Sequence, residues 1–215
     1  MKKYAFALRN ALPCVLGACF ALLILSAAPA GANVIVNGDF QDGNQDFYSA
    51  FTYSHLDITP EHTYDVISDP SLSHGNAESY FDHTFGTAEG LMMAVNGMDD
   101  AGDTNIIWSQ TVDVVQYRTY YFGVWHSLWA PGPAGLQILV NGDPLGPEFM
   151  AGGDLGVWFY YEITWASVDA TQAVIEIINT TASTVWNDFS LDDISFTLET
   201  ALERNTWAGI KSIWD

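Results

Sequence analysis

The chain has 215 residues, enough for one domain with small appendages. Six Lys and Arg residues stand against 26 Asp and Glu residues, a formal charge of −20 that excludes nucleic acid, whose phosphates need clustered cations. Hydrophobic residues make up 49% and charged residues 15%, so the chain has ample material for a core and is not intrinsically disordered.

The first 32 residues have the pattern of a secretory signal peptide. Three basic residues precede an apolar run over 11–28, and small residues then offer cleavage sites after Ala30 or Ala32. A membrane anchor is the alternative, but the run contains Pro13 and lacks a basic stop-transfer flank. We therefore expect a protein that is secreted or held at the cell surface after the signal peptide is cleaved.

Removal of this segment changes the charge and the cysteine content. Three basic residues then remain against 26 acidic ones, so the formal charge falls to −23. Cys14 and Cys19 leave with the segment, so the mature chain is expected to have no disulfide. No later stretch reaches the ~20 continuous apolar residues of a spanning helix, which predicts no transmembrane segment in the mature chain.

Short β-branched and aromatic runs, bounded by Gly, Pro, Asn and Asp, fill the chain from residue 33 to residue 198. Such runs are typical of antiparallel strands. Val-Asn-Gly follows an apolar run at 36–38, at 95–97 and at 140–142, and predicts a strand end each time. We expect strands at 34–36, 47–53, 63–67, 91–95, 105–114, 119–127, 136–140, 158–165, 173–178 and 189–198.

About ten short strands with loops of this size favour an all-β fold, a two-sheet antiparallel sandwich of the jelly-roll type over residues 33–198. The lack of crossover helices excludes a parallel α/β fold. Residues 199–215 differ in character, because Trp207, Ile210 and Trp214 fall at the spacing of a short amphipathic helix. This C-terminal tail either packs against the edge of the sandwich or orders on a partner.

Two end segments and four interior pieces carry a family resemblance. The ends read NVIVNGDFQDG (33–43) and NDFSLDDISF (187–196), and the interior pieces read DHT (82–84), GLMMAVNG (90–97), WSQTV (108–112) and TYYF (119–122). Together they resemble the galactose-binding-like jelly-roll domains that include many carbohydrate-binding modules, and the domains of secreted bacterial proteins that often carry a PEP-CTERM sorting signal. That signal is missing after Leu198, so anchoring by that route is not expected.

The resemblance implies a structural calcium ion where the first and last strands meet. Carried over by position, its ligands are the Gly38 carbonyl, the Gln41 side chain and a carboxylate from Asp192 or Asp193, oxygens of the kind that Ca²⁺ takes. Relatives usually have Glu at the position of Gln41, and a neutral amide is a weaker ligand. The alternative interpretation makes the acidic residues of both segments turn and strand residues that bond nearby backbone amides.

Other metal sites are not indicated. The acidic cluster at 99–103 lacks the twelve-residue ligand pattern of an EF-hand and is expected to be a solvated loop. The five histidines show no pairing at the i, i+4 spacing of a helical zinc site. Calcium is therefore the only expected cofactor.

Alternation along two predicted strands points to a sugar-binding face. Sugar binding relies on flat aromatic faces with polar partners for hydroxyl groups. The strand at 158–165 places one set of aromatic side chains in the core and puts further rings and a carboxylate on the opposite face. The alternative is that both faces are covered. The predicted ligand-binding residues are Tyr121, Trp125, Trp129, Trp158, Tyr160 and Glu162.

No catalytic residues are predicted. The mature chain has no Gly-x-Ser-x-Gly elbow, no cysteine nucleophile and no Glu-x-Asp-x-x-Glu strand. The leading hypothesis is a secreted noncatalytic domain that binds polysaccharide or another extracellular matrix polymer. The first alternative is a structural surface or biofilm protein that assembles with a cell-surface or matrix protein through residues 201–215. The second is a glycan-active enzyme.

Overall fold

The structure is a computed structural model that describes residues 31–100, 105–183 and 186–199. The predicted signal peptide, apart from its last two residues, and the tail from residue 200 onward lie outside the described residues. Within the described part of the chain, no helix is long and apolar enough to span a membrane.

Nearly all of the regular structure is β-strand. The strands are β1 (Thr52–Tyr53), β2 (Thr63–Ile67), β3 (Met92–Asn96), β4 (Ile106–Asp113), β5 (Thr119–Leu128), β6 (Gly135–Val140), β7 (Asp143–Pro144), β8 (Phe149–Met150), β9 (Phe159–Ala166), β10 (Gln172–Asn179) and β11 (Phe189–Leu198). A single 3₁₀ turn, η1 (Pro70–Leu72), follows β2, and the Asp69 carboxylate caps it by accepting from the Ser71 N–H at 2.9 Å.

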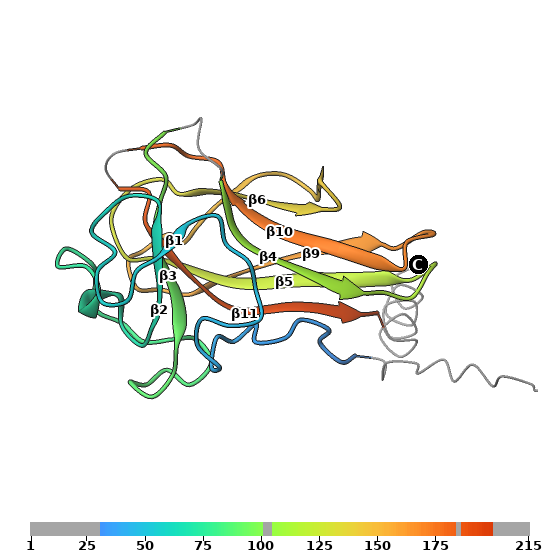
Figure 1. The fold of residues 1–215 in the computed structure, drawn as a ribbon, viewed down its shortest axis with the longest axis horizontal. Helices are drawn as coiled ribbons and strands as arrows, with labels where there is room; N and C mark the ends of the chain where they lie inside the picture. Colours follow the sequence, from blue (N-terminus) through green and yellow to red (C-terminus); the bar gives the residue numbers. More distant parts are fainter. Residues whose placement is uncertain (1–30, 101–104, 184–185, 200–215) are drawn as a thin grey trace, which may run out of the picture.

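The strands form two sheets that pack as a jelly-roll sandwich (Figure 1). The six-stranded sheet has the order β1-β2-β3-β11-β5-β9, and the other sheet has the order β4-β10-β6-β7 with β8 beside β6. All pairs are antiparallel except β1 with β2, which run parallel over two residues. The expected all-β, two-sheet jelly roll is therefore confirmed, with one short parallel pair at its edge.

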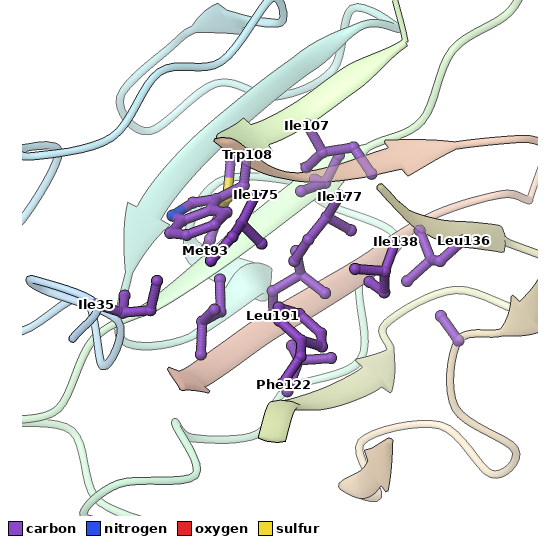
Figure 2. Close-up of a cluster of buried hydrophobic side chains, with 14 of the residues drawn as sticks. Ile35, Met93, Ile107, Trp108, Phe122, Leu136, Ile138, Ile175, Ile177 and Leu191 are labelled. Atoms are coloured by element: carbon purple, nitrogen blue, oxygen red, sulfur yellow. The ribbon is translucent and has the colours of Figure 1, made fainter. Parts of the chain in front are cut away.

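The core lies between the two sheets, and the alternation of side chains builds it. Each sheet turns one set of residues inward, including Phe122 from β5 and Leu191 from β11, against Ile138 and Ile175 from the facing sheet (Figure 2). All four of these side chains are fully buried. At about 25 cal/mol per Å² of apolar surface, such burial is the main term that stabilises the fold.

The outer face of the six-stranded sheet is covered mainly at one end. The chain between β1 and β3 crosses β2 and β3 on that side, where Ile58 and Trp129 form a second, smaller core with Ile67 and Ala94. Figure 1 shows this loop-rich end beside β2 and β3. Residues 80–84 continue onto the face of β5, where His83 stacks on Trp125, and the rest of the β5–β9 face lies beyond this cover.

The predicted strand at 34–36 is wrong, and of the predicted strand at 47–53 only Thr52–Tyr53 forms, as β1. Asn33 makes only an isolated bridge to Thr197, and Tyr48 makes one to Ser109. A side chain takes the place of a partner strand at the first of them, because Gln110 accepts from the Val36 N–H at 2.9 Å and donates to the Val36 carbonyl at 3.0 Å. The ladder therefore cannot extend there.

The Val-Asn-Gly motifs form different structures. Asn141 and Gly142 both have positive φ, 55° and 83°, and join β6 to β7 as the two-residue hairpin that Asn-Gly favours. Asn37 also has a positive φ, of 52°, and lies in a turn. Asn96, in contrast, is the last residue of β3 with an extended backbone, so this motif ends a strand without a tight turn.

Candidate functional site

Two rows of side chains lie side by side on the outer face of the six-stranded sheet. The β5–β9 register pairs Trp125 with Tyr160, Gly123 with Glu162, and Tyr121 with Thr164. Opposed residues of an antiparallel pair point to the same face. The register therefore places four residues on one face, as the sequence predicts: Tyr121, Trp125, Tyr160 and Glu162.

A cleft of about 520 Å³ opens beside these rows and is called the outer cleft below. Trp125 and Tyr160 line it from the sheet, Ser195 and Asp193 from β11, and the segment 33–39 from the start of the described chain. This volume is within the range of small-molecule sites. The outer cleft combines aromatic rings with amide, hydroxyl and carboxylate groups.

Tyr160 is the open aromatic side chain of the outer cleft. It is 46% exposed, and its hydroxyl donates to Glu162 Oε2 at 3.1 Å. Burial, followed by the charge of Glu162, raises the pKa of the Tyr160 hydroxyl. Gly123 makes room for this ring, because a Cβ there would collide with the Tyr160 hydroxyl and lie 2.9 Å from Ser195 Oγ. The missing side chain of Gly123 therefore lets Tyr160 lie across the sheet.

Trp125 is half-buried and held from one side by His83. The two rings stack with centroids 3.7 Å apart at an interplanar angle of 16°, and Tyr160 lies at 5.1 Å from Trp125. His83 is itself fixed, because its Nδ1 is 2.5 Å from Asp193 Oδ2. The indole is therefore fixed in place before any ligand arrives, which lowers the entropy cost of binding.

Trp158 and Tyr121 are on the same face but do not line the outer cleft. Trp158 is half-buried, donates from Nε1 to the Phe81 carbonyl at 3.0 Å and packs edge-on against Tyr80. It holds the segment that carries His83 on the sheet. Tyr121 lies near the start of β5, where its hydroxyl is 3.5 Å from a carboxylate oxygen of Glu199.

Trp129 is not on an open face. Its side chain is fully buried in the smaller core, and its Nε1 donates to the Val95 carbonyl at 3.1 Å. The predicted ligand-binding role of this residue is corrected to a structural one, because the chain between β1 and β3 covers this part of the outer face.

The four predicted calcium ligands lie at one corner of the sandwich, and their oxygens are engaged within the protein. The Gly38 carbonyl accepts from the Ile194 N–H at 2.8 Å. The Gln41 side chain accepts from the Leu91 N–H through Oε1 and donates from Nε2 to two carbonyls, of Asp39 at 2.7 Å and of Leu91 at 3.0 Å. The Gln41 amide nitrogen therefore lies between the carbonyl oxygens of Asp39 and Leu91, where a cation would have to bind to bridge them.

The two aspartates of this corner bind a neighbouring turn. Asp192 is fully buried and accepts from the backbone N–H groups of His83 at 2.7 Å and Thr84 at 3.2 Å. Asp193 pairs with His83 and accepts from the Thr84 hydroxyl at 2.9 Å. Burial, followed by the charge of Asp193, raises the pKa of Asp192 to about 8. In this arrangement these oxygens accept from donors within the protein, and calcium at these residues stays a prediction.

Several residues of the outer cleft were not predicted from the sequence. His83 is 42 positions from Trp125, and nothing in the pattern of either segment shows that their rings stack. Asn33 and Asn37 line the cleft, although their segment was expected to form a strand. The nearest sequence signal was the Asp-His-Thr piece at 82–84, which contributed to the family resemblance without a role of its own.

Comparisons with family models and with curated proteins give no match. The fold matches solved structures of carbohydrate-binding modules. TmCBM61, solved in complex with β-1,4-galactotriose, is 18% identical with a TM-score of 0.50, over 78% of this chain and 99% of that one. The CBM22-1–CBM22-2 tandem domain of Paenibacillus barcinonensis Xyn10C is 15% identical with a TM-score of 0.51, over 81% of this chain and 48% of that one. At these identities the likeness shows the fold alone, a two-sheet jelly roll.

Proposed function

We propose that this chain is a noncatalytic carbohydrate-binding domain that holds a glycan in the outer cleft. One observation carries the proposal: Tyr160 presents an aromatic side chain, 46% exposed, in a cleft otherwise lined mainly by amide, hydroxyl and carboxylate groups. A sugar ring offers C–H faces for the aromatic side chain and hydroxyl groups for its polar neighbours. The fold shared with solved carbohydrate-binding modules supports the same class of function.

The charges of the cleft favour a neutral glycan. Asp39 and Asp193 both line it, and the whole chain carries a formal charge of −20. Uronic acid or sulfate groups would be repelled by these carboxylates. A neutral polysaccharide pays no such penalty, and carboxylates are good acceptors for its hydroxyl groups.

The proposal places this domain outside the cell, with the signal peptide of residues 1–32 removed near Ala30 or Ala32. N-terminal sequencing of the exported protein tests that part, and a mature protein that still begins at Met1 would contradict it. A calcium ion at Gly38, Gln41 and Asp192 or Asp193 is a separate proposal. A melting temperature that chelation leaves unchanged would remove it.

Affinity gel electrophoresis against a panel of neutral polysaccharides tests the proposed function. The wild-type chain is expected to be retarded by at least one of them, and Tyr160→Ala to bind at least about tenfold more weakly. Tyr117→Ala is the matched control, because Tyr117 is 74% exposed and lies in the turn before β5, away from the outer cleft. Equal retardation of both variants, or none for the wild type on any glycan, would contradict the proposal.

A further inference from the structure

A second cavity, of about 200 Å³, lies at the loop-rich end of the six-stranded sheet and is called the end cavity below. Strand register brings its residues together. Phe189 of β11 pairs with Val95 of β3, so the preceding Asp188 lies next to Asn96. The His62 N–H donates to the Gly97 carbonyl at 2.9 Å, which places the neighbouring Glu61 at the same end. Glu61, Asn96 and Asp188 all line the cavity.

Oxygen atoms without donors gather here. Asn96 is 4% exposed, and its Nδ2 donates to the carbonyls of Ile58 at 2.8 Å and Thr59 at 3.3 Å. These bonds fix the orientation of the amide. Its Oδ1 is buried and has no hydrogen-bond partner. Glu61 Oε2 is also buried without a partner. An unpaired buried acceptor destabilises the fold, and more strongly when it is charged.

Most of the buried side-chain atoms without a hydrogen-bond partner are acceptors. Among the described residues, four buried side-chain atoms lack a hydrogen-bond partner, and three of them are the oxygens of Glu61, Asn96 and Asn187. Asn187 immediately precedes Asp188, and its Nδ2 already donates to the Met98 carbonyl at 2.9 Å. The fourth atom is Trp108 Nε1, which does not line the end cavity, whereas Glu61 and Asn96 do. Unpaired oxygens are the ligand type that a hard cation takes.

No Lys or Arg side chain neutralises the two carboxylates. His74 also lines the end cavity, and burial lowers the pKa of its imidazole, which disfavours the charged form. Arg118 is the only Lys or Arg in the described ranges, and it precedes β5 at the end opposite to the cavity. Burial, followed by the charges of Asp188 and Asp99, raises the pKa of Glu61 to about 7. Burial also raises the pKa of Asp188 to about 6. Both shifts express the cost of holding these anions together without a counter-charge.

We propose that the end cavity binds a hard divalent cation, Ca²⁺, through the carboxylates of Glu61 and Asp188 and the amide oxygen of Asn96. Ca²⁺ takes six to eight oxygens, and water completes such a set in a cavity of this size. No group of three or more His, Cys, Asp or Glu side chains that suits a metal occurs in the described part of the chain. The site therefore depends on an amide oxygen beside two carboxylates.

This location differs from the corner of Gln41. At that corner, the side-chain amide of Gln41 donates to two backbone carbonyls. At the end cavity, the side-chain amide of Asn96 donates to the Ile58 carbonyl, and its Oδ1 has no hydrogen-bond partner. The proposal also does not depend on sugar binding, because none of its three residues lines the outer cleft.

Calorimetric titration of the chelator-treated full-length protein with CaCl₂, together with thermal melts, tests the proposal. The wild type is expected to bind Ca²⁺ at the millimolar or submillimolar level of extracellular modules and to melt at a higher temperature when it is bound. Glu61→Gln and Asp188→Asn keep the shape of each side chain and remove its charge. Each is expected to weaken Ca²⁺ binding by at least about tenfold.

The melting temperature without calcium separates a ligand from a structural residue. Because each variant removes a repulsive charge, both are expected to melt at or above the wild-type temperature in chelator, while losing the calcium-dependent rise. Asp193→Asn is the matched control at the other corner and is expected to keep the full rise. No Ca²⁺ binding by the wild type, or a rise lost in Asp193→Asn and kept in Glu61→Gln and Asp188→Asn, would overturn the proposal.

Discussion

Trp125 and Trp129 lie four residues apart and start from the same face of the same sheet, yet their surroundings are opposite. Trp125 borders the outer cleft and stacks on His83, whereas Trp129 is fully buried in the smaller core. Alternation along β5 places Trp125 on the outer face, and Trp129 directly follows the end of β5 at Leu128. The chain that crosses the sheet then determines which ring stays open.

Buried polar groups fix the chain that covers the loop-rich end of the sheet. Asp65 is fully buried under it and accepts from the Leu56 N–H at 2.8 Å and the Ser73 hydroxyl at 2.9 Å. On the open half, the carboxylate of Glu162 is exposed and accepts from the Tyr160 hydroxyl at 3.1 Å. Asp65 is therefore engaged within the protein, whereas the Glu162 carboxylate remains available to a ligand.

The largest expected effect is on stability. Trp129→Ala leaves a cavity in a closed core and is expected to lower the free energy of unfolding by about 3–5 kcal/mol. Trp125→Ala removes a half-buried ring from an open cleft and is expected to cost at most about half as much. Urea unfolding of both variants measures the difference. Equal losses of unfolding free energy in the two variants would show that Trp125 and Trp129 are not differently buried.

The inward face of the same strand is expected to respond to pH. Burial lowers the pKa of His126 to about 4, and its Nδ1 accepts from the Gly152 N–H at 2.7 Å. The unfolded chain binds the proton near pH 6.5, so stability from neutral His126 is complete above that pH and is lost as pH falls toward 4, up to about 3 kcal/mol. An imidazole NMR titration that shows His126 protonated near pH 6.5 would contradict this.

A smaller effect is expected from the polar anchor of the covered half. Asp65→Asn keeps the shape of the side chain but weakens two hydrogen bonds, and is expected to destabilise by about 1–3 kcal/mol. Glu162→Gln is the matched change on the open half and is expected to stay within about 0.5 kcal/mol of wild type. Thermal melts of the two variants compare them, and a larger loss in Glu162→Gln would reverse the assignment of the halves.

The smallest effect is on binding alone. Gly123→Ala introduces a Cβ where the Tyr160 hydroxyl lies, so this exposed ring must swing away from the sheet. We expect about three- to tenfold weaker glycan binding with nearly unchanged stability, because an exposed side chain moves at little cost. Affinity gels and melts of this variant measure both. Unchanged binding would mean that the position of Tyr160 does not matter.

Patterns of local sequence predicted most of the fold. The strands from residue 63 onward match the structure to within a few residues, and alternation in β5 and β9 correctly grouped Trp125 with Tyr160. The failures have a common physical cause, since each depends on contacts between distant segments. Burial of Trp129 depends on the crossing chain, and the end cavity depends on register that brings Glu61 and Asp188 to one strand end.

An NMR titration with an oligosaccharide of the bound polysaccharide tests the central claim most directly. The indole N–H resonance of Trp125 and the backbone resonances of Tyr160 and Ser195 are expected to shift in proportion to ligand bound, because these residues line the outer cleft. The indole resonance of Trp129 should stay in place, since that ring is buried and bonded to the Val95 carbonyl. Shifts confined to other surfaces, with Trp125 and Tyr160 unchanged, would contradict the proposed site.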